Sequence, residues 1–238
     1  MRPTVEELHH SGQYRLIESF KIDEMNQFIM RELGTAPSPQ QSARQNWKKT
    51  LTMMGVGAIS GALGFTVTYY LVSSVGKSGA GTELWEIGAA VLGLFLLLPI
   101  HELIHGLAFK YIGAPKVGYG YSLKSLMVYA YSQHFPTTMR EVAFVAVMPF
   151  LVITIGLVAG WVLVPAYYVF WAGLLLIHSS ACIGDFVLIR YWYRHRPRTI
   201  YTYDDVEGER MSYFFEPVET QPPGGPALAS PDRMGYVS

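Results

Sequence analysis

His101, Glu102 and His105 form the pattern HExxH, the arrangement in this chain with the clearest chemical meaning. On a helix, residues four apart lie about 40° apart around the axis and one turn along it, so both imidazoles can reach one metal ion from the same face. Glu102 lies beside them, where it can accept a proton from water without being a ligand. The pattern therefore predicts a zinc site with His101 and His105 as ligands and Glu102 as general base. The alternative to a metal site is that these three side chains lie at the end of a membrane helix and extend toward the polar membrane surface. Such a role requires no particular spacing of the residues.

A catalytic zinc ion usually has three protein ligands and one open position. Asp185 is the predicted third ligand, because it is the only acid in the apolar run of residues 165–193. His101 lies about 17 residues into one predicted membrane span and Asp185 about 20 residues into another that runs in the same direction. At about 1.5 Å per residue, their depths agree within a turn. The alternative roles for Asp185 are a helix cap or an ion pair with Arg190.

His178 precedes Asp185 by seven residues and falls on nearly the same face of a helix. Four roles are open for it: a fourth metal ligand, a hydrogen-bond partner that supports a ligand, a donor that binds the substrate carbonyl, or a polar contact between helices without a chemical role.

The apolar residues, 50% of the chain, are concentrated in long runs, and the formal net charge is zero. Residues 51–75, 84–112, 142–164 and 165–193 are each long enough to cross a bilayer core. The neutral charge gives no reason to expect a nucleic acid partner. The single cysteine, Cys182, argues against a disulfide framework and against a cysteine-based zinc site. The polar, acidic N-terminus does not resemble a cleavable targeting segment.

The pattern of charge and composition predicts three parts. Residues 1–47 are expected to form a cytosolic N-terminal segment and linker, residues 48–198 the membrane metallopeptidase domain, and residues 199–238 a flexible tail that ends in a proline- and glycine-rich stretch. Lysine and arginine gather before the first span, between the second and third, and after the fourth. This distribution predicts a multi-pass protein with both termini and the middle loop in the cytosol.

Residues 117–131 alternate with a period of two, which predicts a small cytosolic β-hairpin. Its edge could bind an extended substrate peptide through main-chain hydrogen bonds, or the hairpin could only plug the site.

The motifs HELIHG, GAPKVGYG, YAYS, VMPF and HSSACIGD resemble a family of membrane proteins named putative zincin peptidases, over about residues 85–195. That family is similar to the site-2-protease group of intramembrane zinc metalloproteases. The resemblance implies that His101, His105 and Asp185 hold zinc and that Glu102 is the general base. In that group a glycine follows the acid, whereas here Phe186 follows Asp185.

These observations predict an all-α integral membrane protein with about four transmembrane helices, a small hairpin and flexible termini. The expected function is hydrolysis of peptide bonds by a membrane-embedded zinc metallopeptidase, with Zn²⁺ as cofactor and a peptide or membrane-protein substrate. The alternatives are a membrane metal-binding or transport protein, a haem protein that uses His105 and His178, and a catalytically silent scaffold.

Overall fold

Helices and an antiparallel sheet together make up the part of the chain that the computed structural model describes, residues 2–34, 80–123 and 127–218. The N-terminal segment contains α1 (Val5–His10), β1 (Tyr14–Lys21), the 3-10 turn η1 (Ile22–Glu24) and α2 (Met25–Glu32). The long helices are α4 (Ala80–Tyr111), α5 (Met139–Leu163), α6 (Tyr168–Ala181) and α7 (Ile183–His195). The remaining elements are β2 (Gly118–Ser122), β3 (Met127–Tyr131), β4 (Thr137–Thr138), the 3-10 turn η2 (Pro165–Tyr167), β5 (Tyr201–Asp205) and β6 (Met211–Pro217).

The helices α4 and α5 are long and apolar enough to cross a membrane. Their candidate spans are Trp85–Tyr111, with a mean hydropathy of 2.1, and Met139–Leu163, with a mean hydropathy of 2.7. The start of α5 is fixed locally: the Thr138 side chain accepts the Glu141 N–H, and the Glu141 side chain accepts the Thr138 N–H. This reciprocal pair is a capping box, with glutamate three residues after the N-cap threonine.

The fourth predicted span is not one straight helix. Its residues form η2, α6 and α7, and the chain bends by 50° between the last two helices, at Cys182. The described residues therefore contain two candidate spans, or three if the bent pair is one span, rather than four. The predicted span at residues 51–75 lies outside the described residues.

The prediction of an all-α fold is wrong. Four strands form an antiparallel sheet in the order β1-β6-β5-β4, and β2 and β3 form a second, two-stranded sheet at the predicted hairpin. Tyr14 to Lys21 pair with Met211 to Pro217, so the sheet joins segments about 200 residues apart. Residues 219–238 of the predicted flexible tail lie outside the described residues. Its first part, residues 199–218, contains β5 and β6, which carry several Tyr and Phe residues. These residues bury their side chains only when the N-terminal strand pairs with them.

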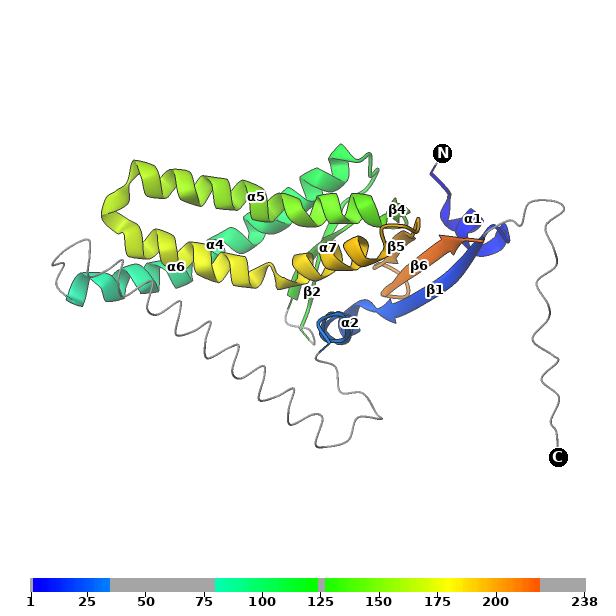
Figure 1. Cartoon of the computed structure of the whole chain (residues 1–238), viewed down its shortest axis with the longest axis horizontal. Helices are drawn as coiled ribbons and strands as arrows, with labels where there is room; N and C mark the ends of the chain where they lie inside the picture. Colours follow the sequence, from blue (N-terminus) through cyan, green and yellow to red (C-terminus); the bar gives the residue numbers. More distant parts are fainter. Residues whose placement is uncertain (1, 35–79, 124–126, 219–238) are drawn as a thin grey trace, which may run out of the picture.

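Two apolar clusters hold the parts together. Ala90, Ile153, Leu157 and Leu174 pack between α4, α5 and α6, which lie side by side in Figure 1. A second cluster joins α2, the start of α5, α7 and the sheet; it consists of Phe28, Met139, Val187, Tyr191, Ile200 and Phe214. The second cluster seats the sheet at the end of the helices where α7 finishes (Figure 1).

Candidate metal centre

The two histidines of the HExxH pattern lie on one face of α4, ten and six residues before its end at Tyr111. Their Nε2 atoms are 3.1 Å apart, and their rings meet edge to face at a centroid distance of 4.7 Å. The spacing of four residues on a regular helix produces this arrangement directly.

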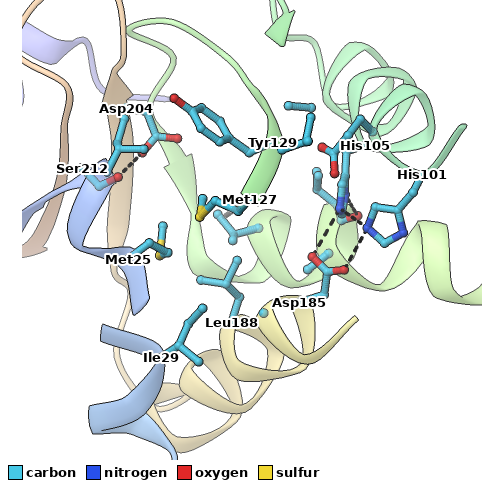
Figure 2. Close-up of a pocket in the computed structure, with 18 of the residues that line it drawn as sticks. Met25, Ile29, His101, His105, Met127, Tyr129, Asp185, Leu188, Asp204 and Ser212 are labelled. Atoms are coloured by element: carbon cyan, nitrogen blue, oxygen red, sulfur yellow. Dashed lines mark hydrogen bonds and ion pairs between the residues drawn. The ribbon is translucent and has the colours of Figure 1, made fainter. Parts of the chain in front are cut away.

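Asp185 comes to the same point from the first turn of α7 (Figure 2). One carboxylate oxygen, Oδ2, is 3.2 Å from His101 Nε2, and the other, Oδ1, is 3.3 Å from His105 Nε2. The bend at Cys182 puts Asp185 at the beginning of a helix, where the unpaired N–H groups and the helix dipole stabilise a negative charge. The structure therefore brings His101, His105 and Asp185 together.

The orientation of His105 is set by α5. Its Nδ1 lies 3.0 Å from the carbonyl oxygen of Val145, a buried residue of that helix. A carbonyl can only accept, so Nδ1 carries a proton, and Nε2 is the nitrogen that faces His101 and Asp185. Metal-binding histidines usually have such a partner on their other nitrogen. The sequence gives no sign of this contact, because a backbone carbonyl leaves no mark on residue type.

Glu102 is buried beside this group, with 7% of its surface exposed. A carboxylate oxygen of Glu102 lies within 4.8 Å of the donor atoms of His101 and His105, and its Oε2 is buried without a hydrogen-bond partner among the described residues. The backbone of Ala130, on β3, contacts the same carboxylate. An unpaired buried carboxylate oxygen costs free energy unless a water molecule or a cation interacts with it.

His178 and Cys182 lie on the other side of His101. The His178 ring is 5.8 Å from the His101 ring, centroid to centroid, and its Nε2 is 3.8 Å from Cys182 Sγ. Donor atoms of His101, His178 and Cys182 lie within 4.8 Å of one another, so these three side chains could also hold a cation. A single cysteine is expected to exclude any cysteine-based zinc site, whereas the tertiary structure brings Cys182 into a mixed group of possible ligands.

All five predicted site residues line one cavity of about 570 Å³. The cavity continues from the HExxH helix past β3 and α2 to the face of the four-stranded sheet (Figure 2). This size is within the range of pockets that bind small ligands, about 300–1,000 Å³.

One comparison with known proteins found a similarity. Residues 94–200, a little under half of the chain, match a family model described as "Putative zincin peptidase". Searches of curated proteins and of solved structures gave no match. The matched segment contains His101, Glu102, His105, His178 and Asp185. The part of the chain that contains the candidate metal centre is thus similar to the zincin peptidases, and this similarity supports a metallopeptidase.

Proposed function

We propose that this protein is a membrane-embedded zinc metallopeptidase in which His101, His105 and Asp185 hold the metal and Glu102 is the general base. The observation that carries the proposal is the close approach of two imidazoles and one carboxylate: the two Nε2 atoms are 3.1 Å apart, Asp185 Oδ2 is 3.2 Å from His101 Nε2, and Asp185 Oδ1 is 3.3 Å from His105 Nε2. Two ligands about 2.0–2.1 Å from a zinc ion at the tetrahedral angle are about 3.3 Å apart. Each of the three contacts, taken singly, is thus close to the spacing of two ligands on one zinc ion, and a small rotation of the Asp185 carboxylate would present one oxygen to both histidines.

The donor types fit zinc as well as the spacing does. Two imidazoles and one carboxylate are a usual ligand set for a catalytic zinc ion, and they leave a fourth position open. The contact of His105 with Val145 orients the imidazole toward that ion, and the unpaired Oε2 of Glu102 faces the same region without being one of the three proposed ligands.

When bound, zinc supplies Lewis acidity, which polarises a peptide carbonyl and makes a water molecule more acidic. The protein supplies the proton transfers: Glu102 Oε2 takes the proton of the attacking water and gives it to the nitrogen of the leaving amine. Burial excludes bulk water from the Glu102 carboxylate, which keeps the proton at this atom between the two transfers.

Membrane embedding rests on α4 and α5. Their apolar side chains face outward in the described part of the chain, including Leu92, Leu96, Ile155, Val162 and Leu163, each at least two-thirds exposed. In water such a surface would favour aggregation, whereas in a bilayer it contacts lipid tails. The substrate in this proposal is a peptide or a membrane protein whose chain reaches the cavity at the sheet end of the helices, with both termini of the enzyme in the cytosol.

One observation favours a second candidate, a membrane protein that binds or transports metal without hydrolysis. His101 belongs to two donor groups, one with His105 and one with His178 and Cys182. A cation could be held by either group in turn, and a passage of this kind gives Glu102 no proton to move.

The test compares the purified wild type with Glu102→Gln in detergent, using zinc content and cleavage of an unfolded protein substrate such as reduced casein. We expect about one zinc per chain in both proteins and cleavage only by the wild type, because the neutral amide of glutamine cannot take the proton of the attacking water. Equal cleavage by both proteins would exclude Glu102 as the base. Zinc binding without any cleavage by the wild type would favour the metal-transport alternative.

A further inference from the structure

The cavity has a second polar end, which lies away from the metal centre. Figure 2 shows His101, His105 and Asp185 on one side, Asp204 and Ser212 on the other, and Met25, Met127 and Leu188 between them. All of these residues line the same cavity. A substrate at the metal centre can therefore extend a side chain along an apolar passage toward Asp204.

Asp204 is an unusual residue for this position. It lies on β5 opposite Ser212 of β6, and its Oδ1 accepts a hydrogen bond of 2.5 Å from the Ser212 hydroxyl. Its other oxygen, Oδ2, has no hydrogen-bond or ion-pair partner among the described residues, and no lysine or arginine there forms an ion pair with it. An ionised carboxylate in such a place is costly unless a cation pairs with it.

The surroundings of Asp204 explain this cost. Burial raises the pKa of its carboxyl, and the hydrogen bond from Ser212 opposes this effect only in part. The nearby Tyr129 hydroxyl is also buried, and it points toward the Asp204 end of the cavity (Figure 2). The Tyr129 hydroxyl also interacts with Arg210, which is paired with Asp23. Asp204 is thus the carboxylate at this end of a passage whose walls are mostly apolar.

We propose that this end of the cavity is a specificity pocket that takes a lysine or arginine side chain of the substrate, with Asp204 as the residue that pairs with its positive charge. The proposal rests on the peptidase function proposed above and names the side chain that this site selects.

The chemistry of the walls matches such a side chain along its whole length. A lysine has four methylene groups and an arginine three, which can lie against Met25, Met127 and Leu188, while the charged end meets Asp204. Methionine side chains are flexible and adapt to stems of different shape. A neutral apolar side chain of equal length would fill the passage but would leave the carboxylate unpaired, so it would bind less well.

The experiment uses two quenched fluorescent peptide libraries, one that contains lysine and one with norleucine in every lysine position. Norleucine has the stem of lysine without the charge. We expect the wild type to cleave the lysine library with a kcat/KM at least about 10-fold higher. Asp204→Asn should bring the two libraries to within about threefold of each other. The Glu102→Gln variant should not cleave the lysine library. This control excludes a contaminating protease as the source of the cleavage.

Two further variants keep the result interpretable. Asp205→Asn changes the neighbouring acid, which does not line the cavity and instead accepts the backbone N–H groups of Gly208 and Glu209; it should keep the wild-type preference. Ser212→Ala keeps the Asp204 charge and removes its hydrogen bond, so most of the preference for lysine should remain. Equal loss of the preference with Asp205→Asn, or an equal kcat/KM of the wild type for both libraries, would overturn the pocket while leaving the peptidase proposal intact.

Binding is measured separately by saturation-transfer NMR with Nα-acetyl-lysine methylamide and its norleucine analogue. We expect a lysine signal that weakens at least about threefold in Asp204→Asn and a norleucine signal that does not depend on this variant. If the wild type cleaves neither library, the peptidase proposal fails, and this measurement alone decides the pocket: a lysine signal equal in wild type and Asp204→Asn would refute it.

Discussion

Asp185→Asn is the change that most directly tests the metal centre. Asp185 provides one of the three proposed ligands, through oxygens 3.2 and 3.3 Å from the two histidine nitrogens, and it is the only charged one. Asparagine keeps the shape of the side chain but replaces the anionic ligand with a neutral amide. The two imidazoles that remain are neutral, so the site loses its negative charge together with one ligand.

The size of the effect follows from the role of Asp185 as a ligand. Removing a group that only orients a ligand typically lowers metal affinity 10- to 100-fold, so removal of a ligand should lower it by more than about 100-fold, or more than about 2.7 kcal/mol. Glu102→Gln is the matched control, because it also replaces a buried acid with its amide one residue from His101. Since Glu102 is not one of the three proposed ligands, the zinc affinity of this variant should stay within about threefold of wild type.

The assay is competition for zinc between the detergent-solubilised protein and a chromophoric chelator, and it requires no substrate. His178→Ala and Cys182→Ser are measured in parallel, because these residues form the second donor group with His101. Zinc affinity of Asp185→Asn within about threefold of wild type, together with a large loss in His178→Ala or Cys182→Ser, would refute the assignment. The metal would then belong to His101, His178 and Cys182.

Three further predictions concern packing, pH and topology. A Cβ at Gly160 would lie 2.5 and 2.7 Å from ring atoms of Trp171, so Gly160→Ala should destabilise the protein by about 1–3 kcal/mol in detergent melts. Gly156 lies one turn earlier and has no neighbour within 4 Å among the described residues, so Gly156→Ala should stabilise the protein by about 0.5–1 kcal/mol. Equal effects of the two substitutions would contradict the packing of α5 against α6. Because burial raises the pKa of Asp204, the folded protein binds more protons than the unfolded chain above about pH 4, and stability should fall as pH rises from there through the raised pKa. Asp204→Asn removes this dependence, so the melting temperature of the variant should rise relative to that of the wild type as pH increases over this interval. A difference in melting temperature between the two proteins that does not vary with pH would count against a raised pKa of Asp204. A cysteine introduced at position 11, beside the sheet, should react with an impermeant reagent only after cells are opened. A cysteine introduced at position 166, in the connection between α5 and α6, should react in intact cells. Labelling of both positions from the same side would refute a membrane crossing by α5.

Local features of the chain could be predicted from the sequence because neighbouring residues alone determine them. The HExxH spacing fixes that His101 and His105 share a helix face, the alternation around Tyr119 and Tyr129 specifies paired strands, and Thr138 with Glu141 starts α5. Each of these depends on contacts within a few residues, where helix and strand periods are strict.

The chemistry around that helix depends on contacts that no local pattern encodes. The sheet forms because β1 pairs with β6 across about 200 residues, and the bend at Cys182 turns a predicted straight span into two helices. Val145 orients His105 through a backbone carbonyl, and Asp204 faces the cavity only because β5 lies between β6 and β4. Residue types and spacing therefore determined that His101, Glu102 and His105 lie together on one helix, whereas the tertiary structure decided what surrounds them, since packing between distant segments determines which buried groups share a cavity.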